Sequence, residues 1–193
     1  MKQFANEINE EVVTAGVEDA EGIAALNDAI YPKEWHVPPA YLTEIIMGNP
    51  EVYRIIKTPA GVKGIYGLFP LSKAHYTAVL AGKLEEDEVG KYILNYDEPK
   101  AVYLYFITLI VDIRDVERKK YASKLIKDIP VELKRLQEKG IDILEVGCFA
   151  VSPEGKKVVP KLGFTHSGEM AMLNKEYPVF KAKPEQIFAN IKS

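Results

Sequence analysis

The sequence predicts an α/β protein with a mixed sheet and helices on both of its faces. Residues 101–111 (AVYLYFITLIV) are aromatic and β-branched without polar alternation, which is typical of a strand covered on both faces. An amphipathic pattern over about residues 115–139 follows, and residues 141–149 (IDILEVGCF) read as a second buried strand. Strand, long helix and strand make a right-handed crossover between parallel strands. Hairpins precede and follow it, so the other strand pairs are expected to be antiparallel.

The N-terminal part predicts a short strand and two helices. After the strand, Ile23, Leu26 and Ile30 recur at the spacing of an amphipathic helix. Residues 32–39 (PKEWHVPP) are expected to form a loop, because the two prolines at its end cannot extend a helix. Residues 40–49 (AYLTEIIMGN) predict the second helix, which a Gly-Asn pair ends.

A hairpin is expected next. Residues 52–58 (VYRIIKT) and 62–71 (VKGIYGLFPL) have the composition of strands and flank a Pro-Ala-Gly turn. We expect a helical stretch from about Ala74 to Leu80 and a loop from there to the buried strand.

The long helix and the C-terminal part complete the fold. Pro130 lies inside the helical pattern and is expected to kink or divide the helix, which ends at Gly140. Residues 152–163 (SPEGKKVVPKLG) predict a short helix, and strands are expected in 163–173 and 176–182.

Composition limits the classes of function. A chain of 193 residues is expected to form one domain, residues 1–193. A net charge of −3 gives no broad attraction to nucleic acid or an anionic membrane, so any anion site must be local. Cys148 has no partner for a disulfide, and His75 and His166 have no second ligand at metal spacing, so we expect no metal. The N-terminus lacks the apolar core of a signal peptide, so a cytoplasmic protein is expected.

A cluster of positive charge follows the most buried strand. Arg114, Arg118, Lys119 and Lys120 fall within seven residues at the expected start of the long helix. The first turn of a helix already carries partial positive charge, so a bound anion would stabilise this arrangement. Ala122 and Ser123 are small enough to let a phosphate approach the backbone, and Lys156 and Lys157 at the next short helix are expected to converge on the same edge. The alternative is a solvated basic turn.

The order of elements, with residues 109–126 (LIVDIRDVERKKYASKLI) and 141–164 (IDILEVGCFAVSPEGKKVVPKLGF), resembles the GCN5-related N-acetyltransferase (GNAT) family. The resemblance covers most of the chain and is strongest from Tyr103 to Phe164. It implies a fold in which the two central parallel strands splay apart. The family's Q/R-x-x-G-x-G/A phosphate loop falls on residues 117–122, where Ala122 matches but Glu117 and Lys120 depart from the pattern. A register starting at Arg118 restores the arginine but puts Tyr121 and Ser123 at the small positions.

The second family signature, N-x-x-A-x-x-x-Y ending in G-F, falls on Ser152, Gly155, Val159, Gly163 and Phe164. Ser152 would hydrogen-bond coenzyme A where the family has asparagine. Val159 stands where many members carry a tyrosine that protonates the leaving thiolate, and valine has no proton to give.

The resemblance implies an acetyl-CoA-dependent N-acetyltransferase in which a primary amine attacks the thioester directly. Backbone amides near Ile110 and Val111 would polarise the thioester carbonyl. Acetyl-CoA contacts are then expected at Leu109, Ile110, Val111, Arg118, Lys119, Lys120, Tyr121, Ala122, Ser123, Ser152 and Lys156.

Our candidate general base is Glu145, whose burial among apolar groups would raise its pKa toward neutrality; the alternative is an ion-paired glutamate. Tyr105 and Thr108 on the central strand are candidates for orienting water, or else pack in the core. Tyr31, Trp35 and His36 in the loop are expected to contact the acceptor, although Trp35 is equally suited to anchoring the loop.

A second function stays open: a catalytically silent acyl-CoA-binding or regulatory domain of the same fold. The acceptor is either a small molecule or a protein amine. The oligomeric state is also open, a homodimer included.

Overall fold

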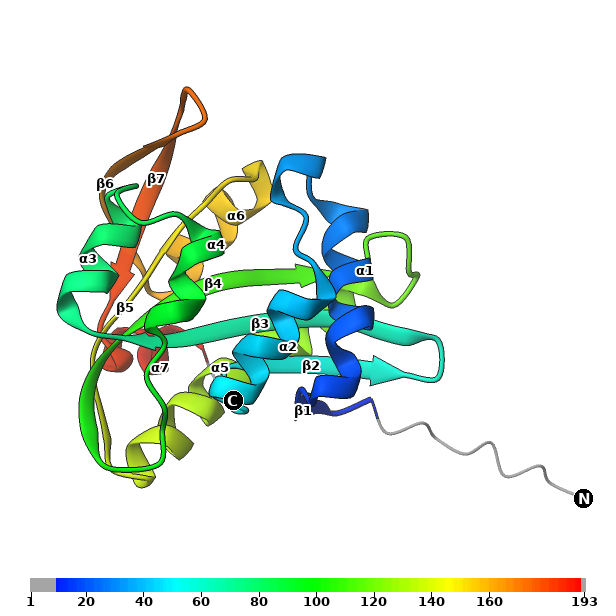
Figure 1. The fold of residues 1–193 in the computed structure, drawn as a ribbon, viewed down its shortest axis with the longest axis horizontal. Helices are drawn as coiled ribbons and strands as arrows, with labels where there is room; N and C mark the ends of the chain where they lie inside the picture. The colour runs from blue at the N-terminus through cyan, green and yellow to red at the C-terminus, as the bar shows by residue number, and fades with distance from the viewer. Residues whose placement is uncertain (1–9, 192–193) are drawn as a thin grey trace, which may run out of the picture.

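The computed structural model describes residues 10–191, and its strands form one mixed sheet in the order β1-β2-β3-β4-β5-β7-β6 (Figure 1). All neighbouring strands are antiparallel except β4 and β5, which are parallel. The strands are β1 (Val12–Thr14), β2 (Tyr53–Thr58), β3 (Gly61–Leu71), β4 (Lys100–Val111), β5 (Ile141–Phe149), β6 (Thr165–Met172) and β7 (Lys175–Ala182). The predicted fold class, a mixed and mostly antiparallel sheet, is confirmed.

Helices cover both faces of the sheet, because successive strand residues point to opposite sides and both sides are apolar. The helices are α1 (Ala20–Ile30), α2 (Pro39–Gly48), α3 (Lys73–Leu80), α4 (Glu86–Val89), α5 (Arg118–Glu138), α6 (Pro153–Val158) and α7 (Pro184–Asn190). One buried cluster joins the sheet to α5 and α7, and the other joins it to α1, α2 and α3. In β2 the neighbours Ile55 and Ile56 are both fully buried, one in each cluster.

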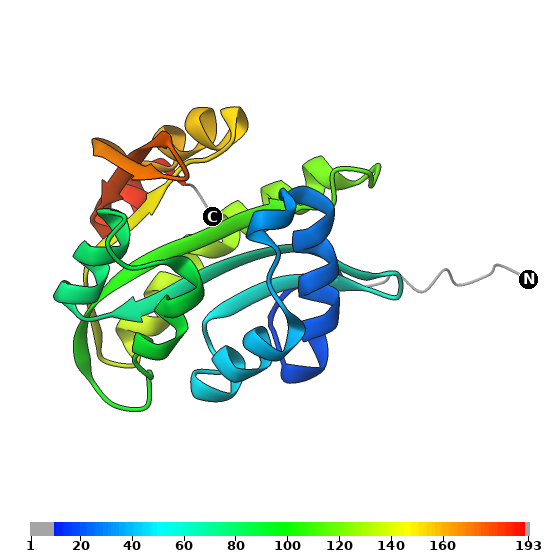
Figure 2. The same ribbon diagram turned by 45° about the horizontal axis from the view of Figure 1, so that its top comes forward.

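The central strands β4 and β5 pair only over part of their length. Their parallel register runs from Lys100↔Ile141 to Tyr105↔Gly147 and then stops, although both strands continue. Beyond that point β4 stays paired with β3, while β5 pairs with β7 and carries the C-terminal strands away from β4 (Figure 2). The strand pair therefore opens into a split, as the family resemblance implied.

A β-bulge marks the start of this split. Gly67 pairs with Thr108 and the next residue of β3, Leu68, pairs with Phe106, so Ile107 is the extra residue of β4. A bulge of this kind bends the strand and increases its local twist. The bend turns the last residues of β4 away from the direction of β5.

Three local expectations need correction. Of the two effects expected of Pro130, division of the helix does not occur, because α5 continues through it with Ile129 and Leu133 buried against the sheet. The segment expected to be a loop before β4 contains α4 and a 3-10 turn, Gly90–Tyr92. The sequence analysis assigned no element after Ala182, where α7 begins at a proline.

Across residues 10–191, no helix is both long enough and apolar enough to span a bilayer. In the same described part of the chain, no cluster of three or more His, Cys, Asp or Glu side chains is arranged to hold a metal ion.

Candidate functional site

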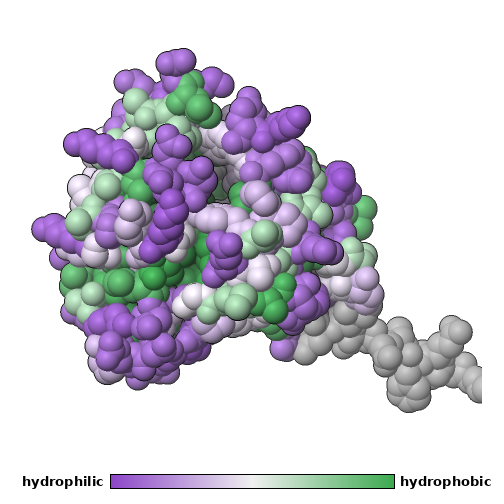
Figure 3. All heavy atoms as spheres, viewed as in Figure 1, coloured by the Kyte–Doolittle hydropathy of each residue, from purple (hydrophilic) through white to green (hydrophobic). Residues whose placement is uncertain are grey.

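The split between β4 and β5 contains a cavity of about 280 Å³. Residues of β4 from Phe106 to Val111 form one wall, and residues 148–152 at the end of β5 form the opposite wall. Figure 3 shows the surface hollowed at this place, with a largely hydrophilic rim. The N–H groups on the side of β4 that faces the split have no strand to bond, because the β5 ladder ends at Tyr105↔Gly147. They are therefore available to a ligand.

At one end the cavity reaches α5 and α6. Its lining there is mostly small or aliphatic, with Ala122, Ile126, Gly155, Val158 and Val159, and Glu154 of α6 is the acidic residue among them. The side chain of Val159, at the position where the family has tyrosine, thus faces the cavity without a titratable group.

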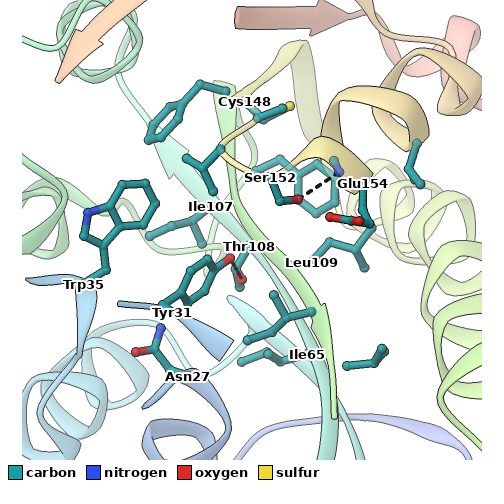
Figure 4. A pocket seen from close by; sticks show the side chains of 18 of the residues that line it. Asn27, Tyr31, Trp35, Ile65, Ile107, Thr108, Leu109, Cys148, Ser152 and Glu154 are labelled. Atoms are coloured by element: carbon teal, nitrogen blue, oxygen red, sulfur yellow. Dashed lines mark hydrogen bonds between the residues drawn. The ribbon is translucent and has the colours of Figure 1, made fainter. Parts of the chain in front are cut away.

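Ser152 lies in this lining but its hydroxyl already has a role. It caps α6, and its Oγ accepts a hydrogen bond from the Gly155 amide at 3.0 Å (Figure 4). Contact of Ser152 with coenzyme A remains a prediction, for which the hydroxyl still has its proton and one lone pair. Lys156 lies exposed in the last turn of α6 and does not line the cavity among the described residues.

A second, open hollow adjoins the first. Ala122 and Ile126 line both, so the two hollows meet along the inner side of the first turns of α5. Three lysines from two elements face the second hollow, Lys119 and Lys127 of α5 and Lys161 of the 3-10 turn Val159–Leu162. Ser123 lines it too. The convergence of positive charge expected from Lys156 and Lys157 is therefore supplied by Lys161.

The other predicted cations at the start of α5 have partners within the chain. Lys120 pairs with Glu10 at 2.5 Å and with Glu117 at 3.6 Å, and the Glu10 contact raises the pKa of the Lys120 amine. Arg118 donates a weak hydrogen bond to the Asp115 carbonyl at 3.4 Å. Tyr121 is 3% exposed and packs in the core, so its side chain is not accessible to a ligand in the cavity.

At the opposite end, the cavity is bounded by α1 and the turn after it. Asn27, Tyr31 and Trp35 line it there, as Figure 4 shows. The Tyr31 hydroxyl lies 3.4 Å from Thr108 Oγ1 of β4, so this hydrogen bond links α1 to the central strand. The Trp35 ring lies 5.8 Å from that of Tyr31 and 6.0 Å, edge to face, from that of Tyr177 in β7.

Glu86, which the sequence analysis did not select, also lines this end. Its carboxylate accepts a hydrogen bond from the Tyr105 hydroxyl, and burial raises the pKa of Glu86 to about 7 despite that bond. Tyr105 itself is 1% exposed and does not line the cavity among the described residues, so it positions Glu86. A carboxyl group with such a pKa can exchange protons near neutral pH.

Two predicted site residues lie elsewhere. Glu145 is not among the described residues that line the cavity; it accepts a hydrogen bond from the Tyr76 hydroxyl at 3.0 Å and pairs with Lys181 at 3.3 Å. It is thus the ion-paired glutamate of the alternative interpretation, and we no longer assign it the role of base. His36 is exposed, pairs with Asp28 at 3.4 Å and is within 3.0 Å of the Tyr31 carbonyl, so it fastens the loop to α1.

The sequence matches no protein-family model and no curated protein. Solved structures do resemble the fold. The GphF GNAT-like decarboxylase in complex with isobutyryl-CoA has a TM-score of 0.66 at 14% identity, over 90% of this chain and 99% of that one. The loading GNATL domain of CurA from Lyngbya majuscula has a TM-score of 0.67 at 9% identity, over 91% and 98%. The PaiA N-acetyltransferase from Thermoplasma acidophilum, in complex with coenzyme A, has a TM-score of 0.56 at 13% identity, over 90% and 98%.

The fold and the split strand pair therefore define a protein of the GNAT fold. The resemblance seen in the sequence is confirmed at the level of the fold.

Proposed function

We propose that the protein is an acyl-CoA-dependent N-acyltransferase that transfers an acetyl group from acetyl-CoA to a primary amine. The observation that carries the proposal is the cavity in the β4–β5 split. It has a buried carboxyl group at one end and opens, at the other end, toward a hollow lined by lysines. The GNAT fold of the structural neighbours, two of them solved with coenzyme A or an acyl-CoA, supports acyl-CoA chemistry in general.

The residues present suit a long, bent ligand with an apolar arm and anionic phosphates. The arm would lie in the split against β4, whose Leu109 to Val111 segment offers unpaired backbone groups. The phosphates would lie beside Ala122 and Ser123 at the first turns of α5, near Lys119 and Lys161. Acetyl-CoA would supply the acyl group, already activated as a thioester.

Glu86 would act as the general base. A primary amine with a pKa of about 10 is protonated at neutral pH and must lose a proton before it attacks. Transfer of this proton to the Glu86 carboxylate frees the nitrogen lone pair. A C–N bond then forms at the thioester carbonyl, and the nitrogen, now positively charged, loses its second proton to water. The C–S bond breaks, and the electron pair leaves with sulfur as the thiolate, which takes a proton from water, so that amine and thioester become amide and thiol.

Two further groups of this chain assist the reaction. Amides of β4 in the split would stabilise the negative charge that develops on the carbonyl oxygen, an effect worth a few kcal/mol. The Tyr105 hydroxyl holds Glu86 in place. No acid stands at Val159, but a thiol with a pKa of about 8.5 can depart as the thiolate.

A silent acyl-CoA-binding domain is the alternative, and one observation favours it: Val159, at the position where many members of the family have a tyrosine, supplies no proton to the leaving thiolate. Decarboxylation of a carboxylated acyl-CoA, suggested by the name of one neighbour, is less suited to this cavity. No lysine, arginine or histidine among residues 10–191 lines it, so an acyl carboxylate would have no counter-charge.

Calorimetry with acetyl-CoA, followed by an assay of thiol release with a panel of primary amines, tests the proposal. We expect binding, and amine-dependent thiol release well above the uncatalysed rate. Binding without turnover of any amine would support the silent domain, and loss of CO₂ from malonyl-CoA without an amine would support decarboxylation. Absence of binding would reject all three.

A further inference from the structure

Two side chains at the α1 end of the cavity, Asn27 and Glu86, have oxygen atoms that can accept a hydrogen bond from a ligand. Asn27 Oδ1 is buried and has no hydrogen-bond partner. A buried acceptor left unpaired destabilises the protein, so an unpaired oxygen on a residue of the cavity wall indicates a ligand that donates a hydrogen bond to it. Asn27 lies one helical turn before Tyr31 on α1, so both side chains face the cavity, where Figure 4 shows them next to each other.

Glu86 adds the second acceptor. It reaches the same end of the cavity from α4, which like α1 precedes β4 in the chain. It lies near enough to Tyr31 that, after burial, its negative charge also raises the pKa of the Tyr31 hydroxyl. The hydroxyls of Tyr31 and Thr108 lie 3.4 Å apart and form one hydrogen bond with each other. An ammonium group is the ligand chemistry that fits an amide oxygen and a carboxylate, because it offers three donors and one positive charge.

The walls around these two acceptors are apolar. Ile23, Tyr31, Trp35, Val37, Leu42 and Tyr53 line this end. Trp35 contacts Tyr177 of β7, so the turn after α1 and the β6–β7 hairpin meet above the cavity. We take this contact to limit the width available to the acceptor, which favours a compact group over an extended peptide.

The cavity lacks partners for further charges on the acceptor. Within the described chain, its lining includes no cationic side chain, and its acidic side chains are Glu86 and Glu154. Glu154 is exposed on α6, at the acyl-CoA end. An amino acid would therefore bury an uncompensated carboxylate, and a polyamine would bury an uncompensated second ammonium.

We infer that the acceptor is a monoamine: a primary ammonium on a compact, uncharged apolar group, held by Asn27 and Glu86 and packed against Tyr31 and Trp35. The inference rests on the proposed function, of which it names the acceptor class.

The test compares kcat/KM for butylamine and benzylamine with the values for lysine, spermidine and trialanine, using thiol release from acetyl-CoA. We expect the two monoamines to be at least tenfold better substrates. Equal or faster turnover of lysine, spermidine or trialanine would overturn the inference.

Calorimetry separates this inference from the proposed function. Acetyl-CoA binding without turnover rejects acyl transfer, and the monoamine site is then tested by titrating butylamine and spermidine into the protein saturated with coenzyme A. Binding of butylamine alone supports the site. Binding of neither amine, or of spermidine more tightly, overturns it. If acetyl-CoA itself does not bind, the same titration on the free protein decides.

Variants of Asn27 probe the acceptor atom. Asn27→Leu removes the oxygen at similar volume and should raise the KM for butylamine about tenfold, with the Kd of acetyl-CoA unchanged. Asn27→Asp keeps an acceptor and should retain the KM, which a purely structural role of the asparagine would not predict. Asn95→Leu, at an exposed asparagine outside the cavity lining, is the matched control and should change neither constant. An unchanged KM in Asn27→Leu would remove Asn27 from the site.

Discussion

Glu86 belongs to a run of four acidic residues, 85–88, that reads as a solvated surface in the sequence. The structure turns this one carboxyl inward, because Glu86 and the fully buried Val89 are three residues apart and lie on the same face of α4. Leu84 and Val89 are the apolar residues on either side of the run. They are five residues apart, which does not match the spacing of three or four along one helix face, so the sequence contains no clear sign that Glu86 is turned inward.

Substitution of Glu86 tests its role as base. Glu86→Gln should lower kcat/KM by at least about 100-fold, because general base catalysis contributes about 10²–10⁴ and glutamine still accepts the Tyr105 hydrogen bond. The base must be unprotonated. Since burial raises the pKa of Glu86 to about 7, wild-type kcat/KM should increase with pH through that value and level off above it.

The pH profile of Glu86→Gln should lack this inflection. Glu88→Gln is the matched control, since Glu88 is an exposed acid of the same helix paired with Lys91. A full loss of activity in the control, or an unchanged pH profile in Glu86→Gln, would contradict the assignment.

At the scale of elements, the bulge at Ile107 shapes the split, and a glycine makes room for it. A Cβ built on Gly67 would lie 2.7 Å from Ile107 Cγ2 and 2.9 Å from Tyr53 Cε1. Tyr53 and Ile107 both line the cavity, so a side chain at position 67 would push both of these residues out of their present places.

We therefore expect Gly67→Ala to destabilise the protein by about 1–3 kcal/mol, the usual cost of overpacking, and to lower turnover. Urea unfolding and the thiol-release assay measure the two effects. Gly48→Ala, at the end of α2 where no atom lies within 4 Å of the added Cβ, is the control. Wild-type stability and turnover in Gly67→Ala would show that the bulge tolerates movement.

Elements with regular patterns were predictable, and short ones were not. The β4–α5–β5 crossover has long apolar periodicity, and the β2–β3 hairpin has a turn with proline and glycine. By contrast, α4 has four residues, which is about one helical turn, and α7 has seven, which is about two turns. Neither is long enough for an apolar pattern to repeat clearly. The bulge has no sequence mark apart from Gly67 on the opposite strand.

At the scale of the whole molecule, the candidate site combines segments far apart in the chain. Leu109 to Val111, Ala122 and Ser152 belong to the part that resembles the family, and the structure places them along the cavity as expected. Asn27, Trp35 and Glu86 come from segments outside the part, Tyr103 to Phe164, where the resemblance is strongest. Their meeting depends on how α1 and α4 pack on one face of the sheet, which local patterns do not determine.

The shared wall of the two hollows leads to a prediction about phosphates. Lys119→Glu combined with Lys161→Glu should weaken binding of acetyl-CoA at least tenfold, because it reverses two of the three lysine charges at the second hollow. Binding of acetyl-pantetheine, which has no pyrophosphate, should not change. Calorimetry measures both.

Lys175→Glu, at an exposed lysine of β7, is the control for a change of overall charge. Equal weakening by the control, or equal loss for both ligands, would contradict a phosphate site at this hollow.

Trp35 is the single tryptophan of the chain, and it lies in the wall of the cavity between Tyr31 and Tyr177. Indole emission depends on the polarity and the ring neighbours around it. The chain therefore has a single indole fluorophore, which lies at the α1 end of the cavity, where the amine is proposed to bind, and not at the lysine-lined hollow. Titrations followed by its fluorescence would register arrival of an amine directly, without a label and without any requirement for turnover.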